Sequence, residues 1–395
     1  MKRRDFIKKT GLASSLFYVP SFVNAFNHLD INLTNKRLVI VQLSGGNDGL
    51  NTVVPFNNDI YYKNRPTLAQ ATSTLLKLND ELALHKGLAP IKNLFDKGYL
   101  SIINNVGYPN PNRSHFRSTD IWQTASDSDD YLPTGWIGRY LDNYGKAPHS
   151  SIEVDDSLSL VMKGNSKNGM AVQDAAQLFR NCQDPYFKKV LEHKNDLHLS
   201  EHNLGYLYKT MIAAESSANY IYNTSKTFNS TQTYPDNPLA KQLKTAAEFI
   251  NSGVDCKILY TSLGGFDTHF NQEGRQDRLL NVYAESMDAF VKDLQQNNTF
   301  KDTIILTFSE FGRRVKQNAA NGTDHGTANN VFIIGENLKK KGIYNEAPNL
   351  SDLDENGDLK FTIDFRRIYA TLLKEWLEVD AELILTNTFK PLSFL

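Results

Sequence analysis

The chain is poor in cysteine and has no excess of either charge. Its 395 residues include only two cysteines, Cys182 and Cys256, which form no C-x-x-C pair. This excludes a scaffold built from disulfides; one disulfide between them stays open, but we expect Cys256 to be a buried free thiol. Lysine plus arginine total 43 and aspartate plus glutamate total 44, so the sequence predicts no nucleic-acid partner.

Long apolar runs are also missing, which predicts that the chain has no stable transmembrane anchor. The first 25 residues have a basic start, an apolar stretch from Gly11 to Val23 and small residues up to Ala25, so we interpret residues 1–25 as a secretory signal. The run that begins Arg3-Arg4 resembles the twin-arginine export motif. This predicts that the twin-arginine export machinery is a partner and that the protein is periplasmic or exported; an ordinary secretory signal is the alternative.

The remaining sequence alternates short apolar runs with amphipathic helical patterns. This alternation predicts an α/β fold with a mainly parallel central sheet and helices on both faces. We expect a single domain over residues 36–395, in which residues 131–234 could form a cap or insert. The expected strands lie at Leu38–Leu43, from Ser101, at Cys256–Leu263, Asp302–Gly312 and Val331–Gly335, and the clearest helices at Leu239–Gly253, Arg278–Asn297 and Arg366–Leu377.

Polar loops rich in glycine follow or precede four of these strands: "LSGGNDGLN", "LGGFDTH", "TFSEFGRR" and "NGTDHGTANN". Ligands of open α/β sheets bind beyond the carboxyl ends of the strands, so these loops are the place to expect a site. Carboxylates with imidazoles suit Zn, Mn or Fe, whereas carboxylates alone suit Mg or Ca. The sequence therefore predicts a divalent metal site whose ion (Zn, Mn, Mg or Ca) is not specified. The candidate ligands are Asp48, Asp267, His269, Glu310, Asp324 and His325.

Five segments together carry a resemblance to a known family. They are "GGNDGLNTVVP", "RSHFRS", "GGFDTHFNQ", "SEFGRR" and "GTDHG", in this order behind the expected leader. The chain resembles a widespread exported family of uncharacterised proteins, which is similar in turn to the alkaline phosphatase and sulfatase superfamily. The resemblance to the superfamily is strongest from Leu239 to Gly335 and at the first strand.

The superfamily resemblance implies roles for particular residues. An aspartate after the first strand binds metal, which implies this role for Asp48. The pair after a middle strand implies that Asp267 and His269 bind one ion, and the last superfamily histidine matches His325. The nucleophile is a residue at a helix start, for which Ser114 is the nearest match, with Ser118 the second.

One position departs from the superfamily pattern. Where an Asp-His-Gly is usual, the chain has Glu310-Phe311-Gly312, so the carboxylate is kept and the imidazole is not. The departure implies one full metal site, formed by Asp267, His269 and His325, and one weak or empty site at Asp48 and Glu310. Arg313 and Arg314 would then supply fixed positive charge for an anion.

These motifs predict an exported hydrolase of phosphate or sulfate esters, acting on a small anionic ester through a serine nucleophile or a metal-bound water. The alternative is a non-catalytic descendant that binds an anion, a glycan or a partner protein. Simpler interpretations also stay open for single residues: Ser114 as a helix cap, Asp48 as a turn former and His115 as a packed histidine. The segment "DLDENGDL" has calcium-loop spacing, but Ile363 takes the place of the closing carboxylate, so we expect a hairpin turn at Asn356-Gly357.

Overall fold

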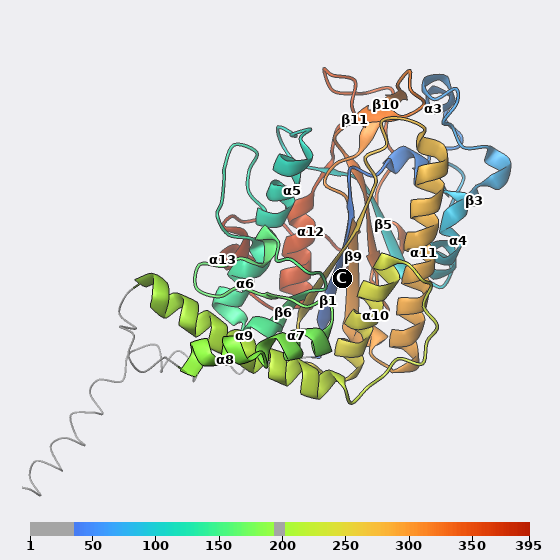
Figure 1. Cartoon of the computed structure of the whole chain (residues 1–395). Coiled ribbons are helices and arrows are strands. Elements are labelled where there is room, and N and C mark those ends of the chain that lie inside the picture. Colours follow the sequence, from blue (N-terminus) through green and yellow to red (C-terminus); the bar gives the residue numbers. More distant parts are fainter. Residues whose placement is uncertain (1–34, 193–201) are drawn as a thin grey trace, which may run out of the picture. The chain divides into compact units, whose positions relative to one another are not determined.

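The core of the protein is a nine-stranded sheet (Figure 1) in a computed structural model that describes residues 35–192 and 202–395. The expected signal at residues 1–25 lies outside this part. Eight strands follow one another in space, and β14 (Ile363–Asp364) pairs separately with β5. Their order is β13 (Gly342–Ile343), β5 (Leu100–Gly107), β12 (Asn329–Ile334), β9 (Thr303–Phe308), β1 (Arg37–Ser44), β8 (Ile258–Gly264), β6 (Ser151–Glu153) and β7 (Met170–Ala171).

The sheet is parallel except at β12, which runs antiparallel to both of its neighbours. Strand β1 has apolar residues at successive positions because both of its faces are buried. Leu38 and Ile40 belong to one hydrophobic cluster, and Val39 and Val41 belong to the other. Side chains of a strand alternate between faces, so the two clusters lie on opposite sides of the sheet.

Helices cover both clusters, as Figure 1 shows. The cluster of Val39 includes side chains of α4 (Ala89–Asp96), α10 (Pro238–Asn251) and α11 (Gln272–Gln296). The cluster of Leu38 includes side chains of α5 (His115–Thr124), α6 (Trp136–Tyr144) and α12 (Phe365–Thr371). The predicted α/β class, with a mainly parallel sheet and helices on both faces, is confirmed.

The other elements are short or lie outside this sheet. A three-stranded sheet contains β2, β4 and β3, and β10 pairs with β11 in a hairpin. The bounds are β2 (Val53–Val54), β3 (Leu76–Lys77), β4 (Ala83–Leu84), β10 (Arg313–Gln317), β11 (Thr323–His325), α3 (Asp59–Asn64), α7 (Ala175–Cys182), α8 (Pro185–Glu192), α9 (His202–Ser225), α13 (Ala381–Leu385), a π-helix at Leu372–Trp376, and 3-10 turns at Gly49–Asn51, Thr72–Thr74, Lys86–Leu88, Pro148–Ser150, Leu160–Met162 and Phe300–Asp302.

Several smaller predictions can be compared with this fold. Residues Lys36–Leu395 form one compact unit, and within residues 131–234 the strands β6 and β7 extend the central sheet. Cys182 and Cys256 are both buried free thiols, so the disulfide alternative does not apply. The calcium-like segment is a turn closed by a bridge between Leu353 and Leu359, with Gly357 at a φ of +79°. Among the described helices none is both long and apolar enough to cross a membrane.

The direction of the strands brings four loops to one edge of the sheet. The parallel strands β1, β8, β9 and β5 end at this edge, and the antiparallel β12 begins there. The β10–β11 hairpin extends from the same edge (Figure 1), and His325 is the last residue of its second strand. Residues that are more than 200 positions apart in sequence, such as His115 and His325, can therefore meet there.

Candidate metal centre

The loops after β1 and β8 touch through a glycine. Gly45 has a φ of +115°, and a Cβ added to it would lie 2.5 Å from the backbone nitrogen of Asp267. Only glycine allows both this conformation and this approach. The Gly45 N–H also donates to the Glu310 carboxylate at 2.8 Å, so a third loop is held at the same point.

Three imidazoles surround one oxygen of Asp267. The Nε2 atom of His269 lies 3.0 Å from Asp267 Oδ1, and the Nε2 atoms of His115 and His325 each lie 3.4 Å from it. The Nε2 atoms of His269 and His325 are 2.9 Å apart. The histidines come from α5, from the loop after β8 and from β11, so the structure brings together three distant segments.

The opposite nitrogen of each imidazole is held by an oxygen. His115 Nδ1 lies 2.8 Å from a Glu310 carboxylate oxygen, and His269 Nδ1 lies 3.2 Å from Asp324 Oδ1. His325 Nδ1 lies 2.7 Å from the backbone carbonyl of Arg113. A backbone carbonyl and an ionised carboxylate only accept hydrogen bonds, so each Nδ1 carries the proton and each Nε2 presents a lone pair.

Such an arrangement calls for a cation. Two imidazole lone pairs that face each other at 2.9 Å repel unless a metal ion or a proton lies between them. The Nε2 atom of His115 is buried and makes no hydrogen bond. In a tetrahedral site with bonds of about 2.0–2.1 Å, ligand atoms lie about 3.3 Å apart, close to the separations seen around Asp267.

The types of ligand atom in the centre limit which metal ions fit it. His115, Asp267 and His325 offer ligand atoms within 4.8 Å of one another, and His269 Nε2 contacts the last two of these residues. Imidazole nitrogens with one carboxylate suit Zn and related transition ions better than Mg or Ca, which prefer oxygen ligands. The residues present therefore fit a divalent transition metal such as Zn.

Arg313 links the loops beneath these ligands. Its guanidinium donates to the carbonyls of Gly46 and Thr323 at 2.6 and 2.9 Å, and to Asp267 Oδ1 at 2.8 Å. The side chain is fully buried, so the role in binding an anion that we predicted for Arg313 does not fit its position. Arg314 is 40% exposed and lies 3.4 Å from Asp358, which leaves it as the better candidate for such a role.

The charges of the centre shift the pKa values of its groups. Partial burial would raise the pKa of Asp267, but the Arg313 guanidinium outweighs this effect and, with His269 and His325, holds that pKa well below its ordinary value. The hydrogen bond to Glu310 raises the pKa of His115. Burial lowers the pKa of His325, and the positive charge of Arg313 acts in the same direction. Asp267 is thus an anion over the whole neutral range.

Asp48 lies apart from these imidazole contacts, although we predicted it to be a metal ligand. It is 1% exposed, and its Oδ2 atom lies 2.6 Å from the guanidinium of Arg65, which is also buried. Gln272 donates to the same oxygen. Because a guanidinium already neutralises this carboxylate, Asp48 has the environment of a buried ion pair.

The two candidate ligands Glu310 and Asp324 have supporting positions. Each accepts a hydrogen bond from the Nδ1 atom of a different histidine and thereby orients that imidazole. Glu310 is buried and Asp324 is exposed. Neither carboxylate shares in the contacts around Asp267 Oδ1.

The two serines that we considered as nucleophiles differ in access. Ser114 is exposed and is the N-cap residue of α5, but its side chain makes no capping hydrogen bond. Ser118 is fully buried, bonds Tyr108 at 2.7 Å and donates to the carbonyl of Glu310 at 2.7 Å. Only the Ser114 hydroxyl is accessible to a substrate.

Comparison with family models gives one match, which covers residues 35–387 and is described as a protein of unknown function, DUF1501. The chain belongs to this family. No curated protein matches the chain. The family description assigns no chemistry, so the site has to be interpreted from its own residues.

The chain is similar to several solved structures, each at low sequence identity and with a TM-score below 0.5. The zinc complex of the C-terminal periplasmic domain of EcEptC from Escherichia coli is 11% identical, with a TM-score of 0.38 over 76% of this chain and 73% of that one. An alkaline phosphatase superfamily protein from Vibrio parahaemolyticus is 11% identical, with a TM-score of 0.40 over 90% and 70%. The PsFucS1 sulfatase from Pseudoalteromonas sp. is 9% identical, with a TM-score of 0.38 over 94% and 76%.

Sequence reasoning missed His115 as a member of the centre. It noted that the superfamily pattern has an imidazole at position 311, where this DUF1501 member has a phenylalanine, and it proposed no histidine to replace that imidazole. The Phe311 ring packs against His115 and His325, with 4.8 Å between centroids in both cases. The sequence did contain a signal for His115. In "RSHFRS" this histidine directly follows Ser114, the candidate nucleophile, so it could have been expected at the same edge of the sheet.

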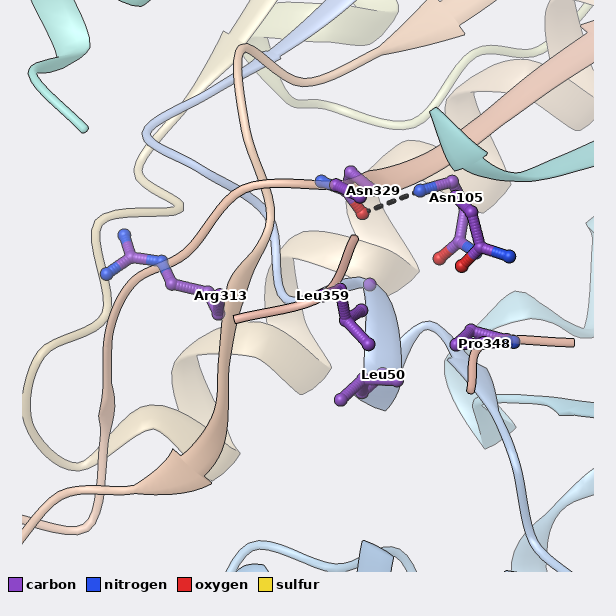
Figure 2. Close-up of a pocket in the computed structure, with 9 residues that line it drawn as sticks. Leu50, Asn105, Arg313, Asn329, Pro348 and Leu359 are labelled. Atoms are coloured by element: carbon purple, nitrogen blue, oxygen red, sulfur yellow. Dashed lines mark hydrogen bonds between the residues drawn. The ribbon is translucent and has the colours of Figure 1, made fainter. Parts of the chain in front are cut away.

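The protein is tightly packed behind the centre. The cavity beyond Arg313 (Figure 2) has a volume of about 10 Å³ and is lined by residues that include Leu50, Asn329 and Leu359. That is room for about one water molecule. Figure 2 shows the Arg313 guanidinium pointing away from this cavity. A substrate would therefore have to approach from the exposed side, where His269 and Asp324 lie.

Proposed function

We propose that the protein is a metal-dependent hydrolase of phosphate or sulfate esters. The observation that carries this proposal is the convergence of three Nε2 atoms on Asp267 Oδ1, with every Nδ1 already bound to an oxygen. A divalent ion held there would supply Lewis acidity toward the oxygens of a bound ester. Zn is the ion that this donor set favours, and one ion is the expected number.

The protein's own residues would prepare the site for this ion. Glu310, Asp324 and the Arg113 carbonyl keep the imidazoles in the tautomer that binds metal. Arg313 keeps Asp267 ionised. Since none of these contacts has to form during binding, the site is organised in advance.

Ser114 is the nucleophile that we propose. Its hydroxyl is exposed, and it precedes His115 at the start of α5, where the free N–H groups of the first helical turn favour an anion. The hydroxyl would attack the phosphorus or sulfur atom, the alcohol of the ester would leave, and water would then release the inorganic anion. An activated water in place of Ser114 is the alternative.

The test combines metal binding with turnover. The purified protein, stripped of metal and reloaded with Zn, should bind one ion and hydrolyse 4-nitrophenyl phosphate or 4-nitrophenyl sulfate. Ser114→Ala should keep the ion and lose turnover, and His325→Ala should lose both. A protein that binds no ion after loading, or that shows no turnover which Ser114→Ala abolishes, would leave only the binding alternative.

We also propose that the protein acts outside the cytoplasm, after export by the twin-arginine machinery. The support is the pattern of residues 1–25, with Arg3-Arg4 ahead of an apolar stretch. Fractionation of cells that express the whole chain should place it outside the cytoplasm. Replacement of both arginines by lysine should keep it inside, whereas an ordinary secretory signal would tolerate that change.

A further inference from the structure

Two exposed phenylalanines directly follow two of the histidines in the centre. Phe116 is 88% exposed and follows His115, and Phe270 is 63% exposed and follows His269. Neighbouring Cα atoms are about 3.8 Å apart, so each phenylalanine begins beside its histidine. The centroids of both histidine rings lie within 4.7 Å of the His325 ring centroid, so both phenylalanines are next in sequence to members of a single cluster.

Single exposed apolar side chains are normal on protein surfaces. Each exposed aromatic ring leaves apolar area in water, at a cost of about 25 cal/mol per Å² that burial would recover. Exposed apolar groups that gather in one place mark interaction sites. Tyr131, which is 74% exposed, adds a third ring on the α5 side, where it lies 3.8 Å over Arg117.

We propose that Phe116 and Phe270 bind an apolar ring in the alcohol part of the ester substrate. This inference rests on the proposed function, because it is the bound ester that would bring the alcohol part between them. The anionic part would sit at Asp267 and the three histidines, and the alcohol part would extend outward past the two phenylalanines. Offset or edge-on ring contacts have centroids 4.5–7 Å apart and favour aromatic partners.

The charge around the phenylalanines argues against an anionic membrane surface as the occupant. The segment after α5 carries the exposed acidic residues Asp127, Asp129 and Asp130, of which Asp127 forms an ion pair with Arg366. Arg117, which follows Phe116 in sequence, binds three backbone carbonyls of this segment, so the segment is held against the first turn of α5. The carboxylates of Asp129 and Asp130 would repel anionic lipids, whereas they leave an uncharged ring in a substrate unaffected.

Two phosphonates that cannot be hydrolysed provide the test. Calorimetry on the Zn-loaded protein should show that phenylphosphonate binds more tightly than methylphosphonate. Phe116→Ala and Phe270→Ala should each weaken the binding of phenylphosphonate by about 3- to 10-fold, the range expected for loss of one aromatic contact. Methylphosphonate affinity and Zn content should not change. Tyr186→Ala, which removes a ring that is 78% exposed on α8, is the matched control and should change neither affinity.

The outcomes separate this inference from the proposed function. If both phosphonates bind with equal affinity, or if the phenylalanine variants weaken both alike, the ring site is overturned and the metal site stands. If neither phosphonate binds, the proposed function fails and this inference fails with it. A third outcome is that the original protein binds phosphatidylglycerol vesicles, that the two variants do not, and that the protein binds both phosphonates alike. This outcome would overturn the ring site in favour of a membrane surface.

Discussion

Asp48 and Asp267 are two carboxylates at the same edge of the sheet, and each has a buried arginine as partner. Their surroundings are otherwise opposite. Asp48 is 1% exposed, and its remaining neighbours include the uncharged Gln272. Asp267 is 47% exposed, and three imidazoles face one of its oxygens. The same residue type at equivalent ends of two adjacent strands thus serves a buried ion pair in one place and a candidate metal centre in the other.

The difference shows what a guanidinium does to a carboxylate. Arg65 bonds Asp48 Oδ2, Asn51 and the carbonyl of Val315, whereas the buried Oδ1 atom of Asp48 has no hydrogen-bond partner. A metal ion at Asp48 would lie beside this guanidinium and be repelled by its positive charge. At Asp267 the guanidinium of Arg313 lies on the buried side, and the imidazoles occupy the exposed side. This comparison is the structural argument for one ion in place of two.

The largest effect should come from breaking the Asp48 pair. Asp48→Asn leaves the buried Arg65 without its counter-charge, which typically costs about 3–5 kcal/mol. We expect the free energy of unfolding, measured by urea denaturation, to fall by this amount. His269→Ala, which changes a side chain that is 40% exposed, should cost far less in the metal-free protein. If Asp48→Asn leaves stability unchanged and lowers the Zn content instead, Asp48 is a ligand and the comparison is wrong.

Removal of an imidazole should act on metal affinity. His269→Ala should weaken Zn binding by more than about 100-fold, because loss of a ligand should exceed the 10- to 100-fold loss typical of the residues that orient ligands. Competition with a chromophoric chelator measures this change. The control is His149→Ala, since His149 bonds Ser217 far from the centre and should leave Zn affinity unchanged. Equal losses in the two variants would mean that Zn binds to histidines without a specific site.

The sequence was sufficient to predict the fold class and the edge at which the site would lie, because strand direction follows from apolar runs and loop composition. It brought Asp267, His269 and His325 together through their motifs. It assigned Asp48 to a second metal site, weak or empty, and could not identify its partner Arg65, since Arg65 comes from a segment without a recognisable motif. The sequence also could not predict that Glu310 orients an imidazole, because this role depends on the direction in which the His115 side chain points.

The carboxylates that orient the imidazoles should have a smaller effect on Zn affinity. Glu310→Gln keeps an oxygen that can accept from His115 Nδ1 but removes the charge, so we expect a loss of about 10-fold. Asp324→Asn should lower the Zn affinity by a smaller factor, because Asp324 is 53% exposed and water can replace its contact with His269. Calorimetric titration of the two variants with Zn gives the comparison. A greater loss for Asp324→Asn would mean that the exposed side of the centre, and not the buried side, controls metal affinity.

Glu153 is a third carboxylate to compare with Asp48 and Asp267, and its hydrogen-bond partner is an uncharged serine. Glu153 ends β6, is 6% exposed, and accepts from the N–H and hydroxyl of Ser159 at 2.7 and 3.0 Å. Burial raises the pKa of Glu153 from 4.5 to about 7, whereas the arginine beside Asp267 lowers the pKa of that group. Because the folded protein holds this proton more tightly than the unfolded chain, the free energy of unfolding should fall as the pH rises from about 4.5 to 7 and level off above that range.

Glu153→Gln should remove this pH dependence, because the amide keeps an acceptor and cannot ionise. A pKa raised from 4.5 to about 7 corresponds to at most about 3 kcal/mol. At pH 8 we expect the variant to be more stable than the original protein by about 1–3 kcal/mol, and at pH 4.5 equally stable. Glu355→Gln, at an exposed glutamate in a turn, should show no such difference. A Glu153→Gln variant that is less stable at pH 8 would mean that this carboxylate has an unrecognised cation partner, and the contrast with Asp48 would disappear.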